Sequence, residues 1–130
     1  HNSEIEQTLK KYSKKKIVFN FTPHLTPMFR GILSTIYIEV KSNVSQNKIK
    51  KVLTDYYKND IFIKILKNNS FISTNDVINT NRCHISVCKT KNRNKLIILS
   101  IIDNLIKGGS GQGVQNMNLR FGFPLTTGLI

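Results

Sequence analysis

The sequence has no apolar run near the ~20 residues of a membrane-spanning helix, and its start shows no signal-peptide pattern. We therefore expect no membrane partner. It has only two cysteines, Cys83 and Cys88, five residues apart on an expected strand. An odd spacing places them on opposite faces, which argues against a disulfide or a shared metal ion. The three histidines, His1, His24 and His84, also lack metal-ligand spacing. Free thiols predict a reducing, cytoplasmic compartment.

Acidic residues are scarce. Seven Asp and Glu stand against 20 Lys and Arg, which gives a net charge of +13. This charge raises the alternative of a small basic nucleic-acid-binding module. However, the basic residues are spread along the chain, and the one dense cluster, at residues 10–16, lies at the end of an expected helix, where cations suit the helix dipole. Enrichment in Lys, Asn and Ile is also what a biased genome composition produces. We expect no nucleic-acid partner.

The composition fits one globular domain. A chain of 130 residues with 39% hydrophobic and 21% charged residues can bury a core. Because the chain starts at His1 and a helix cap follows at once, we expect it to be a piece of a longer protein. It shows no internal repeat and no low-complexity tract.

Periodicity predicts the secondary structure. Ser3-Glu4-Ile5-Glu6 fits a capping box and predicts a helix over residues 4–14. Ser45 can cap a second helix, and a third begins at Gln112. Alternating or continuous apolar runs predict strands at residues 16–21, 32–40, 61–66, 82–89 and 95–102, the last two joined as a hairpin. This order predicts an α+β fold with helices on one face of the sheet.

A glycine-rich stretch follows the last strand. Gly108, Gly109, Gly111 and Gly113 fall within six residues and precede a run with helical spacing, Val114, Met117 and Phe121. Strand, glycine loop and helix can bring bare backbone N–H groups to an anion or a flat ligand, and a plain tight connection is the equal alternative. The stretch matches neither a Walker loop nor the dinucleotide fingerprint.

Arg30 is the one basic residue between a proline-containing loop at residues 22–29 and the strand that begins at residue 32. Its guanidinium can clamp a carboxylate or a phosphate with two hydrogen bonds. An exposed arginine at a strand start is the alternative.

Four motifs together carry a resemblance to a known family. They are HNSEIEQ at residues 1–7, FTPHLTPMFRGIL at 21–33, NRCHI at 81–85, and DNLIKGGSGQ at 103–112 with its continuation to Asn118. In this order they resemble the N-acetyl-gamma-glutamyl-phosphate reductases of arginine biosynthesis, over the C-terminal part of the family's length.

The resemblance implies an NADPH-dependent reduction of the acyl phosphate of N-acetyl-glutamate to the semialdehyde, through a cysteine thioester. It implies a fold like the C-terminal domain of glyceraldehyde-phosphate dehydrogenase, with a mixed, mainly antiparallel sheet. Residues 1–107 would form the substrate and dimerisation domain, incomplete at its start. Residues 108–130 would form a glycine loop and a helix that returns to a separate NADP-binding domain. The full protein would be a dimer or tetramer.

The resemblance also implies roles for residues. His1 and Glu4 would lie on the catalytic side, whereas the nucleophilic cysteine lies outside this chain, which would be inactive alone. Arg30 and Gly31 would bind the substrate. The cofactor would meet the glycine loop, at Gly108, Gly109, Gly111 and Gln112. Gly113 stands where alanine is usual in the family, which weakens the helix start by roughly 1 kcal/mol. A related semialdehyde dehydrogenase with another acyl-phosphate substrate remains an alternative.

Overall fold

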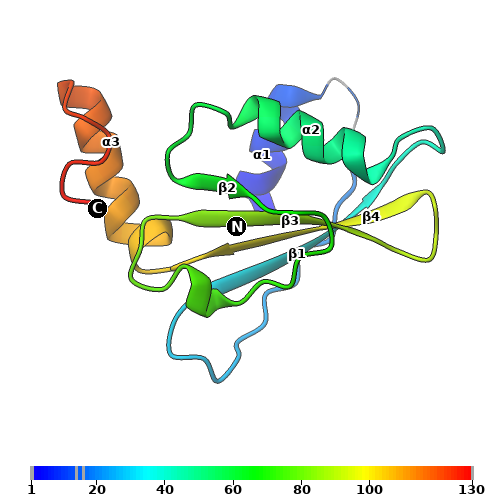
Figure 1. Cartoon of the computed structure of the whole chain (residues 1–130), viewed down its shortest axis with the longest axis horizontal. Coiled ribbons are helices and arrows are strands. Elements are labelled where there is room, and N and C mark those ends of the chain that lie inside the picture. Colours follow the sequence, from blue (N-terminus) through cyan, green and yellow to red (C-terminus); the bar gives the residue numbers. More distant parts are fainter. Residues whose placement is uncertain (1, 14, 16, 130) are drawn as a thin grey trace.

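The computed structural model describes residues 2–13, 15 and 17–129. A four-stranded sheet with the order β1-β4-β3-β2 forms its centre. In chain order the elements are α1 (Asn2–Tyr12), β1 (Ile32–Glu39), α2 (Gln46–Tyr56), β2 (Ile63–Ile65), the short 3-10 helix η1 (Thr74–Asp76), β3 (Cys83–Lys89), β4 (Lys95–Ile102), the π-helical turn η2 (Ile106–Ser110) and α3 (Gly111–Phe121) (Figure 1).

The sheet is mixed and mainly antiparallel, as expected for the α+β class. β4 pairs antiparallel with β1, from Ile32 opposite Ile102 to Glu39 opposite Lys95, and antiparallel with β3. The short β2 adds to β3 in parallel. β4 is therefore a central strand, as its nearly continuous apolar sequence predicts.

The core lies around β3 and β4. Its buried apolar side chains come from the sheet and from the segments that cover it, and they are Phe62, Val77, Cys83, Ile85, Val87, Leu96 and Ile101. α2 packs on β3 and β2 (Figure 1). Ser45 caps α2 by accepting a hydrogen bond from the N–H of Lys48. The buried Gln46 joins α2 to the sheet, because its Nε2 donates to the carbonyl oxygen of Val87 at 2.6 Å.

β1 is one of the two edge strands, and apolar side chains on both of its faces are exposed. Ile32 and Ile36 are 43% and 45% exposed, and on the other face Leu33 and Tyr37 are 50% and 73% exposed. Large apolar side chains exposed on both faces of one edge strand are typical of an interaction surface.

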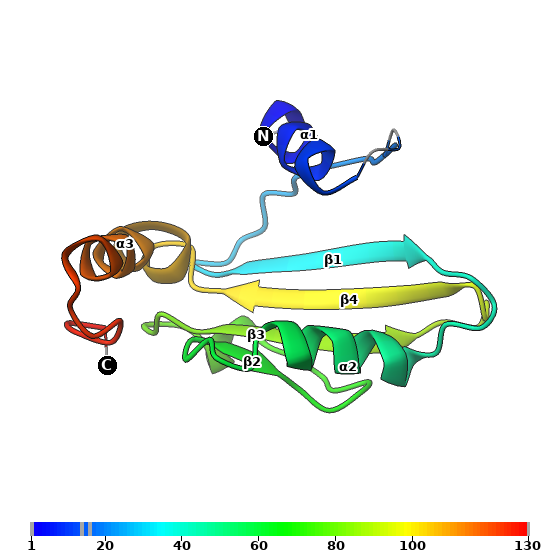
Figure 2. The same cartoon turned by 90° about the horizontal axis from the view of Figure 1, so that it is seen from above.

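The predicted strand at residues 16–21 is wrong. Lys16 is outside the described residues, and residues 17–21 form no ladder; residues 17–31 contain no helix or strand. Ile17, Phe19 and Phe21 do alternate, but alternation yields a strand only where a neighbouring strand supplies hydrogen-bond partners. Figure 2 shows α1 set off from the β1 edge of the sheet.

Among the described residues, no helix is long and apolar enough to cross a membrane.

Candidate functional site

Asp103 directly follows β4, and its side chain is completely buried. Its Oδ1 accepts hydrogen bonds from the backbone N–H groups of Leu105 at 2.8 Å and Ile106 at 3.1 Å. Its Oδ2 accepts one from the N–H of Asn79 at 2.8 Å. Burial raises the pKa of Asp103, but these N–H groups and Arg30 more than offset that effect and hold the pKa below its ordinary value. The site is thus built around a carboxylate that stays charged inside the protein.

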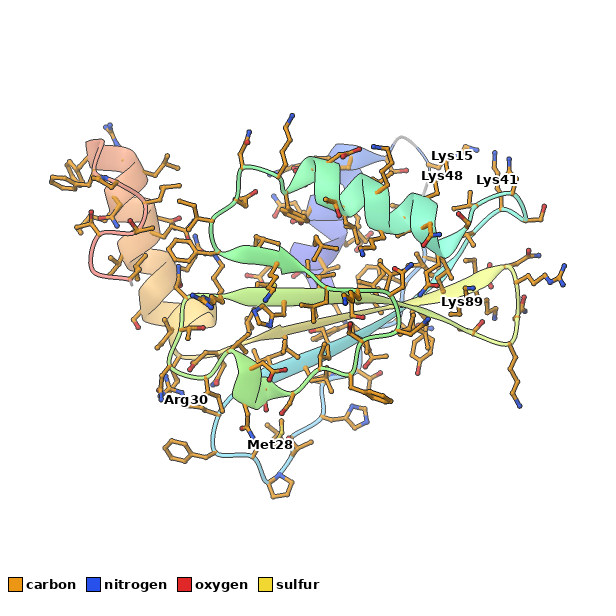
Figure 3. All side chains as sticks on the ribbon, viewed as in Figure 1. Lys15, Met28, Arg30, Lys41, Lys48 and Lys89 are labelled. Carbon is orange, nitrogen blue, oxygen red and sulfur yellow. The ribbon has the colours of Figure 1, made fainter. Side chains whose placement is uncertain are left out.

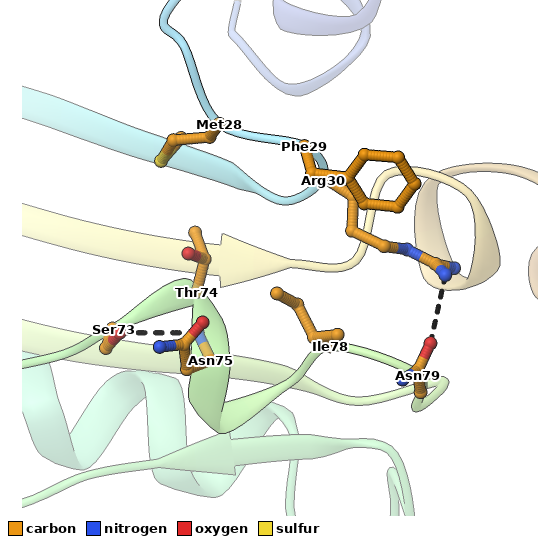
Figure 4. A pocket seen from close by; sticks show the side chains of 8 residues that line it. All are labelled: Met28, Phe29, Arg30, Ser73, Thr74, Asn75, Ile78 and Asn79. Atoms are coloured by element: carbon orange, nitrogen blue, oxygen red, sulfur yellow. Dashed lines mark hydrogen bonds between the residues drawn. The ribbon is translucent and has the colours of Figure 1, made fainter.

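Arg30 lies beside this carboxylate. Its Nε is 2.9 Å from Oδ2 of Asp103, and its Nη2 donates to Oδ1 at 3.1 Å. Its Nη1 donates to Oδ1 of Asn79 at 2.9 Å (Figure 4). Nη1 and Nη2 each use one of their two N–H donors in these hydrogen bonds, so one remains on each terminal nitrogen, while the buried Nε faces Asp103 as an ion-pair contact without a hydrogen bond. The side chain is 17% exposed, so Arg30 is held firmly but remains in reach of a ligand.

Gly31 fixes the backbone next to Arg30. Its N–H donates to Oδ1 of Asn104 at 2.7 Å, which joins the start of β1 to the residue after Asp103. Its φ is +107°, a conformation that side-chain-bearing residues rarely adopt. A Cβ at this position would lie 2.7 Å from Cβ of Thr74. Glycine is therefore required both by the backbone angle and by the close approach of η1.

We expect Gly31→Ala to lower the free energy of unfolding by about 2–4 kcal/mol, because backbone strain and the clash with Thr74 add. Gly122→Ala is the matched control: it has a φ of +74° with open space around it, so strain alone costs about 1 kcal/mol. Urea unfolding of both variants measures the difference. Equal losses would show that the approach of Thr74 does not matter.

An open pocket of about 480 Å³ adjoins Arg30. Its walls come from the end of the proline-containing loop and from the segment around η1, and its lining residues are Met28, Phe29, Arg30, Ser73, Thr74, Asn75, Ile78 and Asn79 (Figure 4). The pocket is a plausible size for a small metabolite. Arg30 is the only basic residue among these lining residues, so it provides the positive charge here. The labelled lysines Lys41, Lys48 and Lys89 lie at the far end of the molecule from Arg30 (Figure 3).

The glycine-rich stretch folds as a turn rather than as an open loop. The N–H of Gly108 donates to the carbonyl oxygen of Asp103, and that of Ser110 to the carbonyl oxygen of Leu105, both at 2.9 Å. The N–H of Gly111 donates to the carbonyl oxygen of Ile106. These three N–H groups are therefore not bare. Of the two alternatives that the sequence pattern left open, bare N–H groups do not apply to them. The π-helical turn leads directly into α3 and satisfies them internally.

Gly111 allows a close contact between segments. It is buried, and a Cβ there would lie 2.6 Å from Oδ1 of Asn81 and from Cγ2 of Ile106. Nδ2 of Asn81 donates to Oε1 of Gln115 at 3.0 Å, and Nζ of Lys107 donates to the same oxygen at 2.8 Å. These contacts fix the start of α3 against the turn that precedes β3.

The structure brings together only some of the predicted site residues. Arg30 and Gly31 meet the end of β4 and, through Asp103, the start of the glycine turn. Gln112 lies in the first turn of α3, where its Nε2 donates to Oδ1 of Asn116. Glu4 lies on α1, which is set off from the sheet (Figure 2). His1 falls outside the described residues.

Sequence reasoning assigned no role to the residues that hold Arg30 and Gly31: Asp103 and Asn79 contact Arg30, and Asn104 accepts from Gly31. A signal for Asp103 exists, because an aspartate directly after a buried strand can cap the turn that follows. The role of Asn79 depends on a contact across 49 positions of the sequence, which no local pattern reveals.

The two cysteines are free, and they lie on opposite faces of β3. Cys83 is buried with its Sγ 3.4 Å from Oγ of Ser100, and Cys88 is half-buried. Among the described residues, no group of three or more His, Cys, Asp or Glu side chains could hold a metal ion.

His84 is a buried histidine on β3, and its Nε2 has no hydrogen-bond partner. Burial lowers its pKa; the charge of Lys64 lowers it further, Asp76 opposes this, and Arg82 lowers it again. The unfolded chain therefore binds the proton more readily than the folded one. The stability that comes from keeping His84 neutral is fully present above the unfolded pKa of about 6.5, and it falls as the pH drops below that value.

We expect the free energy of unfolding to fall between pH 7 and pH 5, by at most about 1.4 kcal/mol per pH unit for this one proton. His84→Leu removes the part of this slope that His84 causes, whereas His24→Gln, on an exposed loop, leaves it in place. Urea unfolding at a series of pH values measures both slopes. An unchanged slope in His84→Leu would contradict the prediction.

The mixed sheet, the exposed edge strand and the buried Arg30–Asp103 pair define an α+β domain that holds a cationic group at one end of its sheet. Residues 1–104 match the family model described as "Semialdehyde dehydrogenase, dimerisation domain", and the chain belongs to this family.

Curated relatives agree with this family. The chain is 47% identical over 129 residues to the N-acetyl-gamma-glutamyl-phosphate reductase of Thermoanaerobacter pseudethanolicus, 43% over 130 residues to that of Halothermothrix orenii, and 42% over 129 residues to that of Staphylococcus aureus. Each match covers 99% of this chain but only 38% of the relative. The resemblance found from the four motifs is confirmed, and the chain spans less than two fifths of the length of these relatives.

Proposed function

We propose that this chain is the substrate domain of an NADP-dependent N-acetyl-gamma-glutamyl-phosphate reductase in the cytoplasm. Such an enzyme converts the acyl phosphate of N-acetyl-glutamate to the semialdehyde and phosphate in arginine biosynthesis. The observation that carries the proposal is 42–47% identity to proteins of that name over 99% of this chain.

The substrate of such a reaction carries a carboxylate and a phosphate, and Arg30 fits this charge. Its guanidinium is fixed by Asp103 and Asn79 and keeps two N–H donors. One donor on each terminal nitrogen suits the oxygens of a carboxylate or phosphate. The N–H of Gly31 is used by Asn104, so in this proposal Gly31 keeps the backbone in place next to the substrate.

The remaining chemical groups are proposed to come from elsewhere in the enzyme. A thiolate attacks the acyl carbon, phosphate leaves, and the resulting thioester is reduced to the aldehyde and the thiol. Cys83 is buried within the sheet, and Cys88 is half-buried, on the other face of β3 from Cys83. Cys83 begins β3 opposite Ile102, at the same end of the sheet as Arg30, but it is buried, whereas Cys88 lies near the other end of β3. We place the nucleophile outside this chain, as the resemblance implies. His1 and Glu4 are proposed for the acid–base side of the site.

The cofactor in its reduced form, NADPH, would supply the hydride when bound and would leave as NADP. Gly108 and Gly109 are exposed and Gln112 is half-buried, so they can present a surface to a flat ring. Gly111 fits this role poorly, because it is buried against Asn81 and Ile106. We therefore propose Gly108, Gly109 and Gln112 as the cofactor-facing residues and give Gly111 a packing role.

The rest of the division into parts is also a proposal. On α3, Met117 and Phe121 are 47% and 69% exposed, which supports a separate NADP-binding domain as the partner of residues 108–130. The exposed apolar side chains of β1 and the family description support a homo-oligomer.

A chimaera tests the proposal. In the reductase of Thermoanaerobacter pseudethanolicus, this chain replaces the matching 38% of the sequence. We expect the chimaera, given the acyl phosphate and NADPH, to consume NADPH, whereas this chain alone gives no turnover. The Arg30→Ala chimaera should show a raised KM for the acyl phosphate. Turnover by the chain alone, or a folded chimaera without activity, would overturn the proposal.

A second candidate is a related semialdehyde dehydrogenase with another acyl-phosphate substrate, which the broader description of the matching family favours. The same chimaera decides between them when it is given aspartyl phosphate in place of N-acetyl-glutamyl phosphate.

A basic nucleic-acid-binding module has only the charge of +13 in its favour, and it predicts retention on DNA that falls steeply with salt.

A further inference from the structure

Asp103 contacts more groups than the pairing of one arginine requires. Its two oxygens meet Nε and Nη2 of Arg30 and the N–H groups of Asn79, Leu105 and Ile106. Through these contacts one buried carboxylate holds the side chain before β1, the turn before β3 and the start of the glycine turn. These three segments are far apart in the sequence, and this carboxylate contacts all of them.

The geometry decides which N–H donors of Arg30 are open. Asp103 takes the edge formed by Nε and Nη2. Asn79 takes one donor of Nη1, and the same residue donates its backbone N–H to Asp103. Each terminal nitrogen therefore keeps one N–H that can donate to an oxygen of an anion. An arginine without Asp103 would lose this orientation, because its long side chain has many rotamers.

We infer that Asp103 is a positioning residue for substrate binding: its carboxylate fixes Arg30 so that the remaining N–H groups of Nη1 and Nη2 bind an anionic group of the substrate, and Asn79 supports the same orientation. The inference rests on the proposed function, in which Arg30 binds that substrate. Because Asp103 also holds Leu105 and Ile106, it sets the position of Arg30 relative to the glycine turn.

The test is a binding measurement by ¹H–¹⁵N NMR on this chain, followed through the Nε–H signal of Arg30. The two probes are N-acetyl-L-glutamate, which has carboxylates only, and inorganic phosphate. We expect one of them to shift the Arg30 signal in the wild-type chain, and which one does so shows which anionic group Arg30 holds. In Asp103→Asn the Kd for that probe should rise about tenfold or more, because a charge-assisted orienting contact is lost.

Two further variants complete the test. Asn79→Ala keeps Asp103 and removes only the Nη1 contact, so a smaller rise in Kd, about threefold, is expected even if Asp103→Asn does not fold. Asp55→Asn is the matched control, because Asp55 pairs with Lys51 on exposed α2, and its Kd should equal that of the wild type.

The outcomes separate the two claims. If the wild-type chain binds neither probe at Arg30, the proposed substrate site fails and the inference fails with it. If the wild-type chain binds a probe and the folded Asp103→Asn and Asn79→Ala variants bind it equally well, the positioning role is overturned and the proposed function stands. A purely structural Asp103 would lower stability without changing Kd in the folded variant.

Discussion

Gly111→Ala is expected to lower the free energy of unfolding by about 2–3 kcal/mol, because overpacking of a tight contact carries a cost of this size. The new Cβ would lie 2.6 Å from Oδ1 of Asn81 and 2.8 Å from the carbonyl oxygen of Ile106. The backbone oxygen cannot turn away, and Asn81 is fully buried and bonded to Gln115. The start of α3 must therefore move away from the sheet. Urea unfolding, followed by circular dichroism, measures the loss.

Gly113→Ala is the matched control, two residues further along the same helix. A Cβ at Gly113 meets nothing within 4 Å, and alanine is a better helix former than glycine by about 1 kcal/mol. This variant should therefore be more stable than the wild type by roughly 0.5–1 kcal/mol. Opposite signs for two identical substitutions in one helix are the expected result. A loss at both positions would contradict the packing seen at Gly111.

Much of the fold follows from local patterns in the sequence. The strand at residues 95–102 was predicted with its observed bounds, because eight residues with a central apolar run and a hairpin before them leave little choice. The cap at Ser45 was likewise correct. The strand at residues 16–21 was not, because its alternating apolar side chains say nothing about whether a neighbouring strand exists. A ladder is a property of two segments, and the sequence of one cannot supply the other.

The candidate site shows the same limit more strongly. Arg30 could be singled out by its type and place, but its two partners are 49 and 73 positions away. The glycine-rich stretch was recognised, yet its pattern could not tell an open loop from a π-helical turn with satisfied N–H groups. That difference is decided by Asp103, which accepts the first two N–H groups of the turn. Long-range contacts therefore determine what the locally visible motifs do.

Asp103→Ala is expected to lower the free energy of unfolding by about 3–5 kcal/mol, the range for breaking a buried ion pair. The variant leaves the N–H groups of Asn79, Leu105 and Ile106 without their acceptor and Arg30 without its counter-ion. Arg30→Ala should cost less, about 1–2 kcal/mol, because Asp103 keeps those three backbone donors. Urea unfolding at neutral pH measures this asymmetry.

The pH dependence provides an independent check on the same pair. The folded-state pKa of Asp103 is lowered. The contribution of its carboxylate to the free energy of unfolding is therefore fully present above the unfolded pKa of about 3.9, and it is lost as the pH falls through the lower pKa of the folded state. The gap in stability between wild type and Asp103→Ala should therefore be constant from pH 7 to about pH 5 and should narrow only below about pH 4. Equal losses for Asp103→Ala and Arg30→Ala would mean that the backbone N–H groups find other acceptors. Asp103 would then act only as a counter-ion, and the link between Arg30 and the glycine turn would not hold.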